Sequence, residues 1–421
     1  MKFIENLDEL EYKKFLNKCP YNHFLQSVSW GNTSEIARKQ KKTIVGLKDD
    51  QGNLVAAGLL LKRVTPFNMC YFYSSRGFIL DYNNKEVLAA FTKELKQFLK
   101  KENAIYLKID PEIKYQTIDS EANKIDGENN YELFNNLIKL GYKHQGFNKL
   151  HEKNEPRYTF RRNLKAYHNM EEINESISKN FMKALKRSYN YDLEVSIADN
   201  LEDFIKLNEH NAKKDGFNGY PASFYRTFFE ETKKEGNAKT FNISLNPKHL
   251  TEKFTKELDE LNKAIENNTL NKKDKGNAKE AIARLEKDIN TFKDLGDKDL
   301  VVCSMICGFT KNGYWTLYIG NDNIAEYTFS VNRVYYEAIL DAFNNGFDFI
   351  DLFGTVGDPH TNYKNTKTLH EYKNRFGGEY VEFIGEFDLI NKPFWYHMLP
   401  IILKVYRSFT KLLKKKRWFI K

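Results

Sequence analysis

The chain has 421 residues, of which 41% are hydrophobic, 14% aromatic and 29% charged, a composition that excludes disordered, collagen-like and low-complexity proteins. Its length supports more than one folded core, and its four cysteines are too few to cross-link a fold of this size. No uncharged apolar run approaches the roughly 18 residues that span a bilayer, and the first residues lack the apolar core of a signal peptide. We therefore expect a cytoplasmic protein with several domains.

The first clear pattern in the chain is a helix followed by a strand. Apolar residues recur at helical spacing over 87–99, and an apolar, strand-like segment follows at 104–110. A second unit of the same kind comes late in the chain, with a helix predicted over 331–345 and a strand over 347–353. Two units of this construction favour two similar α/β domains.

Between these units lies a segment with the spacing of a coiled coil. Apolar residues in 249–295 step by three or four positions on both sides of a polar stretch, which predicts an antiparallel helical hairpin. Its ten basic and ten acidic residues fit a solvated hairpin as well as an arm that contacts tRNA. The hairpin would interrupt a second domain over 151–248 and 296–379, and the first domain would cover 1–150 and regain part of 380–400.

The familiar nucleotide-binding motifs are missing from the chain. It has neither Gly-x-x-x-x-Gly-Lys-Ser/Thr nor Gly-x-Gly-x-x-Gly, so we do not expect a nucleotide cofactor bound by either of these backbone loops. Cys303 and Cys307 share one face of a predicted strand, but no second pair of ligands lies at the spacing of a metal site. The sequence predicts no metal and no cofactor.

Glycines and charged residues are combined in the stretch that follows the second unit. Asp358 and His360 come first, and Lys373 and Arg375 then precede a glycine pair at 377–378. Glycines allow a backbone to approach a ligand closely while cations face it, so this stretch is a candidate site. A surface lysine and an ordinary Asp-Pro turn are the alternative interpretations.

The positive charge of the chain is concentrated at its end. Nine of the 66 Lys and Arg fall in 392–421, which hold no Asp or Glu, whereas the rest of the chain has 57 residues of each sign. The same segment is rich in aromatic and aliphatic residues, a combination that suits an anionic membrane surface, where each cation contributes about 1 kcal/mol. RNA contact and a helix packed on the body are the alternatives. We expect peripheral attachment to the inner face of the plasma membrane.

Several blocks of the sequence resemble the Fem family (FemABX) of peptidyltransferases, which build the interpeptide bridges of peptidoglycan. The most specific are Glu337-x-Ile-x-x-Ala-x-x-x-Gly346 and Leu369-x-x-Tyr372-Lys373-x-x-Phe376-Gly-Gly. The other blocks are Phe24-Leu-Gln-Ser-x-x-Trp30-Gly31, Tyr73-x-x-Arg76-Gly77 leading to Asp81, Lys108-x-Asp110-Pro111 and Pro156-Arg-x-Thr159. The resemblance implies an α/β (α+β) fold of two acetyltransferase-like (GNAT) domains, with a helical arm inserted in the second.

Members of this family take an amino acid from aminoacyl-tRNA and attach it to the stem-peptide amine of a cell-wall precursor, commonly lipid II. The resemblance therefore implies an aminoacyltransferase with aminoacyl-tRNA as co-substrate, and related Fem-type enzymes as candidate partners. The chain departs from the family at Gly77-Phe78, where Gly-Pro is common, and lacks a Lys soon after Trp30-Gly31.

The resemblance also assigns roles to particular residues. It implies that Lys373, with Tyr372 beside it, stabilises the oxyanion of the reaction. The attacking amine, with an ordinary pKa of about 10.4, must lose a proton. The candidate acceptors of that proton in the chain are Asp81, Asp358 and His360, and a phosphate or ribose hydroxyl of a substrate is the alternative; the resemblance does not choose among them. The resemblance also implies an acceptor cleft lined by the first domain and by the basic segment that opens the second, with the candidate residues Arg76, Asp81, Lys183, Lys186 and Arg187. Arg375 is a further candidate substrate-binding residue.

Two other functions fit parts of the sequence. An acyl-CoA-dependent N-acyltransferase of the same fold would need Arg/Gln-x-x-Gly-x-Gly/Ala before a helix to bind pyrophosphate, and the chain has no such segment. A non-catalytic membrane adaptor would use only the hairpin and the basic tail.

Overall fold

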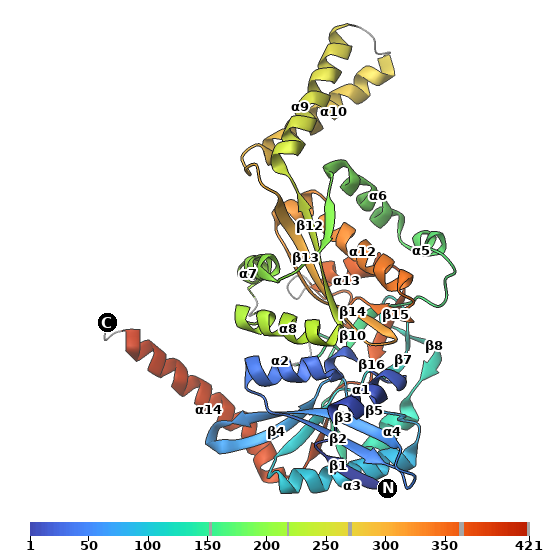
Figure 1. Ribbon diagram of the computed structural model, residues 1–421, viewed down its shortest axis with the longest axis vertical. Coiled ribbons are helices and arrows are strands. Elements are labelled where there is room, and N and C mark those ends of the chain that lie inside the picture. The colour runs from blue at the N-terminus through green and yellow to red at the C-terminus, as the bar shows by residue number, and fades with distance from the viewer. Residues whose placement is uncertain (151–153, 217–218, 268–271, 362–365, 419–421) are drawn as a thin grey trace.

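Two mixed β-sheets, each covered by helices, form the two halves of the molecule, and a pair of long helices projects from the second half (Figure 1). The computed structural model describes the whole chain apart from residues 151–153, 217–218, 268–271, 362–365 and 419–421. Mixed sheets with helices on their faces confirm the predicted α/β class.

The first sheet has the strand order β1-β2-β3-β4-β6-β17-β9, with β5 beside β3. Helix α3 covers one face, because Val87, Phe91 and Leu95 recur at helical spacing and are all buried. It begins where Asn84 Oδ1 accepts the backbone N–H of Val87 at 3.1 Å. The elements of this half are β1 (Lys2–Glu5), α1 (Glu9–Lys18), α2 (Val28–Arg38), β2 (Lys42–Lys48), β3 (Leu54–Thr65), β4 (Met69–Ser74), β5 (Ile79–Leu80), α3 (Lys85–Lys101), β6 (Tyr106–Ile109), α4 (Tyr131–Lys139), β9 (Tyr142–His144) and β17 (Phe387–Ile390).

The second sheet has the strand order β11-β12-β13-β14-β15-β10-β16-β7-β8. The helix predicted at 331–345 is α12, which buries Val334, Ala338 and Ile339 in the core of this half. The elements are β7 (Lys114–Ile118), β8 (Lys124–Asn129), β10 (Tyr158–Asn163), α5 (Met170–Ser176), α6 (Lys179–Ser188), β11 (Glu194–Ile197), α7 (Glu202–Asp215), α8 (Ala222–Glu235), β12 (Ala238–Leu245), β13 (Leu300–Phe309), β14 (Gly313–Asn321), α11 (Asn323–Tyr327), α12 (Ser330–Asn344), β15 (Phe349–Asp351), α13 (Thr366–Asn374) and β16 (Glu379–Phe383).

The two halves exchange strands. Strand β17 lies between β6 and β9 of the first sheet, although it follows the second half in sequence. Strands β7 and β8 lie within 1–150, yet β7 pairs with β16 at the edge of the second sheet. The expected boundary of the first domain is therefore wrong for this hairpin. Hairpins carry no periodicity that reveals which sheet they join, because that choice depends on distant partners.

The helical hairpin consists of α9 (Pro247–Glu266) and α10 (Lys272–Phe292), which pack against each other and project from the second sheet (Figure 1). At its base Asp288 Oδ1 accepts hydrogen bonds from the hydroxyls of Tyr191 at 3.3 Å and Tyr327 at 2.6 Å. The rings of Phe254 and Phe292 also lie against Tyr191. This aromatic base fixes where the arm leaves the body.

A shared core holds the two halves together. Helix α2 of the first half packs on α8 of the second, and the ring of Trp30 lies 6.1 Å from that of Phe224. Phe24 is fully buried, with its ring 5.8 Å from that of Phe228. Because this interface is apolar and closely packed, it holds the two halves in a fixed arrangement.

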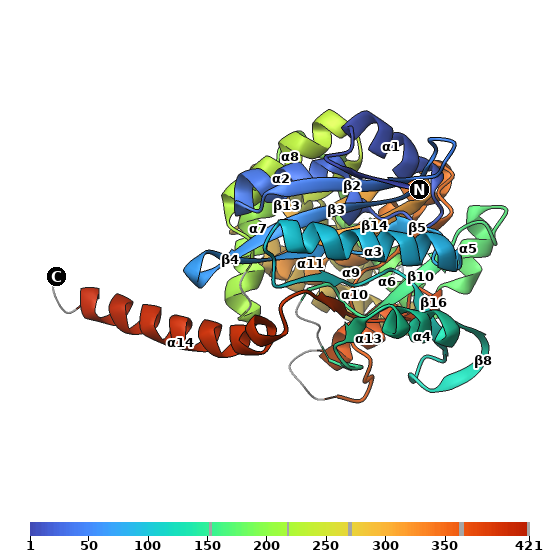
Figure 2. The same ribbon diagram turned by 90° about the horizontal axis from the view of Figure 1, so that it is seen from below.

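The chain ends in a long helix, α14 (Pro393–Trp418), which extends away from the body (Figures 1 and 2). Its first turns are held by Leu399, which is buried against Ile105 and Tyr106. Within the part of the chain that the structure describes, no helix is both long enough and apolar enough to cross a membrane.

Candidate active site

Lys373 lies near the end of α13, with its side chain buried. Its ammonium donates to the carbonyl of Leu352 at 2.8 Å, to that of Gly354 at 2.7 Å and to that of Phe353. These carbonyls directly follow β15. Burial lowers the pKa of Lys373 to about 7, and the nearby carboxylate of Asp351 opposes this shift. The side chain thus carries a charge that responds to pH near neutrality, at a fixed position inside the second half.

A cavity of about 110 Å³ lies beside Lys373. It forms because β14 and β15 run parallel only from Gly313 to Trp315, after which β14 continues to Asn321 paired with β13 but no longer with β15. The strands β4 and β6 of the first half form a similar parallel pair. The cavity is lined by Met305, Thr316, Leu317, Tyr318, Ile319, Tyr335, Leu352, Phe353, Gly354 and Lys373. An elongated group entering between the diverging strands would reach the ammonium.

The glycine pair after α13 has a structural role. Gly377 and Gly378 have φ values of 72° and 99°, which favour glycine. A Cβ on Gly377 would lie 2.5 Å from Arg162, and one on Gly378 would lie 2.7 Å from the carbonyl of Arg161. The pair therefore lets the chain turn tightly against β10. The expectation that these glycines admit a ligand is wrong, because the neighbouring strand fills the space.

Tyr372 is not among the residues that line the cavity. Its ring packs 5.2 Å from that of Phe376 and 6.0 Å from that of Tyr335. Burial raises the pKa of its phenol well above the ordinary value, and its hydroxyl has no hydrogen-bond partner among the described residues. Tyr372 thus anchors α13 to the core beside Lys373 and does not line the cavity.

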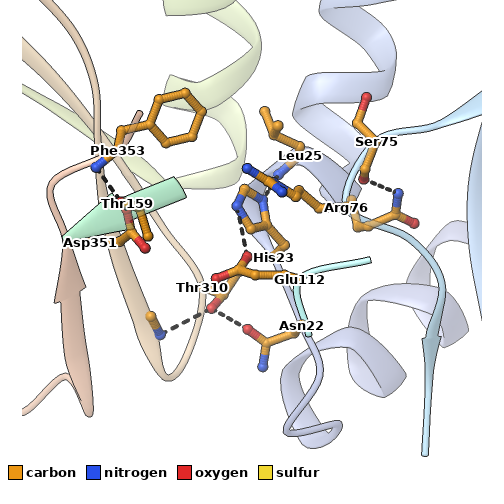
Figure 3. Close-up of polar contacts among 12 residues, drawn as sticks. Asn22, His23, Leu25, Ser75, Arg76, Glu112, Thr159, Thr310, Asp351 and Phe353 are labelled. Carbon is orange, nitrogen blue, oxygen red and sulfur yellow. Dashed lines mark hydrogen bonds and ion pairs between the residues drawn. The ribbon is translucent and has the colours of Figure 1, made fainter. Parts of the chain in front are cut away.

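A buried polar cluster connects this segment with the first half (Figure 3). Asp351 Oδ1 accepts from Thr159 Oγ1 at 2.5 Å and from the backbone N–H of Phe353 at 2.7 Å, while its Oδ2 accepts from Arg161 at 2.8 Å. Arg161 also pairs with Glu112. Because Phe353 supplies one of the carbonyls that hold the lysine, the cluster is continuous with the Lys373 site.

His23 completes the cluster from the first half (Figure 3). Its Nδ1 accepts the backbone N–H of Leu25 at 2.9 Å, and its Nε2 lies 2.9 Å from Glu112 Oε2. Burial, followed by the charges of Arg76 and Arg161, lowers its pKa well below the ordinary value. His23 is therefore neutral, with its single proton on Nε2 facing Glu112.

Arg76 lies at the same boundary, as the sequence suggested. Its backbone N–H donates to Asp110 Oδ1 at 2.7 Å, and its guanidinium donates to the carbonyl of Pro156 at 2.6 Å. Tyr73 donates to the other oxygen of Asp110 at 2.7 Å. Burial raises the pKa of Asp110 to about 7, although Arg76 lowers it. Arg76 thus ties the first sheet to the segment that opens the second.

Two further arginines lie along the boundary. The guanidinium of Arg63 donates to Asn154 Oδ1 at 2.9 Å and lies 4.3 Å from the ring centre of Tyr73, and that of Arg38 lies 5.3 Å from the ring centre of Tyr220. Burial raises the pKa of Glu155, whereas Arg76, Arg38 and Arg63 lower it. These arginines come from separate elements, so sequence spacing gave no signal for their meeting.

Three candidate proton acceptors lie apart from the cavity and the polar cluster. Asp81 is exposed and accepts the backbone N–H of Asn83 at 3.0 Å. Asp358 accepts the backbone N–H of His360 at 3.1 Å, and His360 pairs with Glu121 at 2.7 Å on the surface. The structure therefore does not bring these groups to Lys373.

The basic residues expected in the same cleft as Arg76 also lie elsewhere. Helix α6 buries Phe181 and Leu185, which turns Lys183, Lys186 and Arg187 outward to solvent. The helix packs on α12, at the end of the second half nearer the helical arm (Figure 1). Arg375 is exposed after α13. The prediction of one cleft that holds the α6 cations with Arg76 and Asp81 is wrong, because helical periodicity places those cations on an outer face.

Sequence reasoning missed the polar cluster of His23, Glu112, Arg161 and Asp351. One signal was available: Thr159 and Arg161 alternate on a single strand and therefore share a face. Both of them bind Asp351. Their partner, however, follows almost 200 residues later, and only the pairing of β10 with β15 joins them.

Comparison with known proteins defines the class of enzyme. An aminoacyltransferase FemA of Staphylococcus epidermidis is 27% identical over 435 residues, covering 98% of this chain and 100% of the relative. A lipid II:glycine glycyltransferase of the same species is 27% identical over 436 residues, covering 98% and 99%. The crystal structure of FemX has the same fold, with a TM-score of 0.74 at 24% identity, covering 94% of this chain and 100% of that one. The predicted aminoacyltransferase class is confirmed.

The family follows from the match to a family model. The model of the FemAB family covers residues 7–404, and the chain belongs to this family. The resemblance to the Fem family is thus confirmed over nearly the whole length of the chain.

Proposed function

We propose that the chain transfers an amino acid from aminoacyl-tRNA to the stem-peptide amine of lipid II or a related precursor, building the interpeptide bridge of peptidoglycan. The observation that carries the proposal is Lys373, an ammonium held in the wall of a cavity where two parallel strands diverge. Relatives named aminoacyltransferase FemA and lipid II:glycine glycyltransferase match the chain over nearly its full length.

The proposed reaction is aminolysis of an ester. The amine nitrogen bonds to the ester carbonyl carbon, the carbonyl oxygen becomes negative in the tetrahedral intermediate, and the bond to the ribose oxygen then breaks. Lys373 supplies a positive charge in a buried site, where such a charge stabilises a developing oxyanion by roughly 3 to 4 kcal/mol. The carbonyls of Leu352 and Gly354 hold the ammonium in place for this role.

The proton of the amine needs a destination. The amine is an ammonium at neutral pH, so it first loses one proton to solvent and attacks as the neutral amine. Asp81, Asp358 and His360 do not line the cavity beside Lys373, so the second proton passes to the departing ribose oxygen. The products are then the amide, the free ribose hydroxyl and one proton released to solvent, and atoms and charges balance.

The acceptor substrate, the precursor that carries the stem-peptide amine, is proposed to bind between the two halves. Arg38, Arg63 and Arg76 line this boundary, and the Nε atoms of Arg63 and Arg76 are buried without a hydrogen-bond partner among the described residues. Arginine forks suit phosphate and carboxylate groups. Arg38 ends helix α2, which also contains Trp30-Gly31, so this helix still supplies a cation although the family's lysine is missing.

The donor substrate, aminoacyl-tRNA, is proposed to approach from the side of α6. The start of α6 lies against the Lys373 segment, because Ser178 donates to the carbonyl of Arg375 at 3.0 Å and the ring of Phe181 lies 4.5 Å from that of Phe376. The three outward cations of α6 would contact the RNA backbone while the aminoacyl end enters the cavity.

A membrane location completes the proposal. The segment 392–421 has nine basic and no acidic residues, and α14 carries much of it away from the body (Figure 2). Its cations and apolar side chains suit the anionic inner face of the plasma membrane.

The test is a transfer assay with the purified full-length chain, a panel of charged tRNAs and lipid II, read by mass spectrometry. We expect lipid II to gain the mass of one amino acid with at least one of the tRNAs. No gain with any of them would refute the function. Calorimetry with coenzyme A serves as the comparison, because binding there would favour the acyl-CoA-dependent alternative.

A further inference from the structure

The hairpin that joins β3 and β4 ends in an exposed aromatic ring. Residues Pro66–Asn68 form its tip, and Phe67 is 81% exposed while Val64 is 65% exposed. Phe67 and Asn68 have φ values of 64° and 56°, in the left-handed region that a phenylalanine rarely adopts. This turn directs the ring outward, and among the described residues most of the ring stays uncovered.

Helix α14 has a second exposed apolar face near this tip. Phe394, Ile401 and Val405 are 67%, 56% and 64% exposed and are spaced by seven and four residues, so they lie on one face. Leu399 and Leu403 contact the body from the opposite face. The apolar stripe is therefore presented to the surroundings because the other side of the helix is docked.

The hairpin and the helix share one base. Met69 and Tyr71, which follow the hairpin tip, pack in the same cluster as Leu399 and Leu403 of α14. The rings of Tyr71 and Tyr106 are stacked at 4.7 Å. In both ribbon views the hairpin and α14 extend from the same side of the molecule (Figures 1 and 2). They therefore form one platform with two apolar projections.

The charges near the platform indicate what kind of partner it binds. Residues 54–80, which include the hairpin, contain no Asp or Glu, but their cations are engaged: Lys62 pairs with Glu102 at 2.8 Å, Arg63 donates to Asn154 and Arg76 is buried. The free positive charge beside the platform therefore comes from residues 392–421, which hold nine basic and no acidic residues. Exposed apolar groups next to such a segment match an anionic lipid surface.

We propose that the hairpin tip at Phe67 and the exposed face of α14 insert together into the interface of an anionic lipid bilayer. Two separated contacts fix the orientation of the body, which a single helix would leave free to swing. Arg63 directly precedes Val64 and reaches Asn154 at the boundary between the halves. Docking therefore brings this boundary to the level of the headgroups, where, if the proposed function holds, the anionic part of a lipid-linked acceptor lies.

Liposome sedimentation tests the proposal with the purified full-length chain. Vesicles of phosphatidylcholine alone are compared with vesicles containing 30% phosphatidylglycerol, and we expect binding to the anionic vesicles only. Phe67→Ser should weaken this binding about tenfold, since it removes one large apolar side chain from the interface. Ile401→Ser with Val405→Ser should weaken it at least as much. The matched control is Ile197→Ser on β11, which is 55% exposed and far from the platform in sequence, and it should bind as the unaltered chain does.

Three outcomes would overturn the proposal. Unchanged binding by Phe67→Ser would show that the hairpin does not enter the bilayer, and equal binding to neutral vesicles would remove the role of charge. The alternative occupant of the platform is a second copy of the chain, which sedimentation velocity without lipid would detect as a dimer. If Phe67→Ser dissociated such a dimer, the platform would be a contact between copies and the proposal would fail.

A transfer assay with a soluble acceptor distinguishes failure of the membrane contact from failure of the proposed function. With a stem-peptide precursor that lacks the lipid tail, Phe67→Ser should transfer at the unaltered rate, while with lipid II in vesicles it should be about tenfold slower. If the unaltered chain transfers to neither acceptor, the proposed function fails, whereas the sedimentation result still decides the membrane contact. A variant impaired equally on both acceptors would contradict a role confined to docking.

Discussion

Replacing Lys373 by methionine would remove the ammonium and keep most of the side chain's volume. If this cation stabilises the oxyanion, its loss should lower turnover about 100- to 1,000-fold, corresponding to roughly 3 to 4 kcal/mol. The substrates should still bind, because the three arginines at the boundary and the cations of α6 remain. The measurement is single-turnover transfer from charged tRNA to lipid II with saturating enzyme.

The same variant should change how stability depends on pH. In the folded chain the pKa of Lys373 is about 7, against an ordinary value of 10.5. The unfolded chain therefore binds one more proton between these values, and stability rises as the pH increases from 7 towards 10.5. The difference is of the order of 5 kcal/mol from this residue. Denaturant titrations at pH 7 and 9 should show this rise in the unaltered chain and a smaller one in Lys373→Met.

The matched control is Lys367→Met, on the exposed side of the same helix. It should leave both turnover and the pH dependence unchanged. Transfer by Lys373→Met within threefold of the unaltered rate would refute the oxyanion role. A rise of stability between pH 7 and 9 that is as large in this variant as in the unaltered chain would show that another group titrates.

Three further predictions concern the surroundings of the site. Asp351→Ala removes a buried carboxylate and leaves the half-buried guanidinium of Arg161 with one partner fewer, so it should cost about 3 to 5 kcal/mol of unfolding free energy, measured by urea denaturation. A loss below about 1 kcal/mol would contradict the cluster's structural role. Gly377→Ala should lower the melting temperature by several degrees because its Cβ meets Arg162, and a melting temperature equal to that of the unaltered chain would show that the turn adapts. Replacing the three outward cations of α6 by alanine should weaken tRNA binding and flatten its dependence on salt, checked by filter binding at several salt concentrations; an unchanged slope would exclude α6 from the RNA contact.

Local patterns were sufficient to predict much of the fold. Helices α3 and α12 follow from apolar residues at helical spacing, and the strands after them, β6 and β15, follow from short apolar runs. The helical hairpin was equally visible, because its coiled-coil spacing is a local property. Lys373 was identified through its motif, which a continuous stretch of sequence contains.

The polar cluster could not be predicted in this way. His23, Glu112, Arg161 and Asp351 come from four distant segments, and only strand pairing and the packing of the two halves bring them together. For the α6 cations, local spacing was informative but not sufficient. It predicts that they share one helix face, but whether that face meets the first half or solvent depends on the tertiary structure.

The exchanged strands have a consequence for how the protein can move and unfold. Since β17 belongs to the first sheet and β7–β8 to the second, the polypeptide crosses from one lobe to the other several times. Cutting the gene at any single linker would deprive at least one sheet of a strand, so neither fragment should be stable by itself. The lobes are interlocked, and we expect them to melt as one cooperative unit, with substrate access controlled by surface segments and not by a wide hinge.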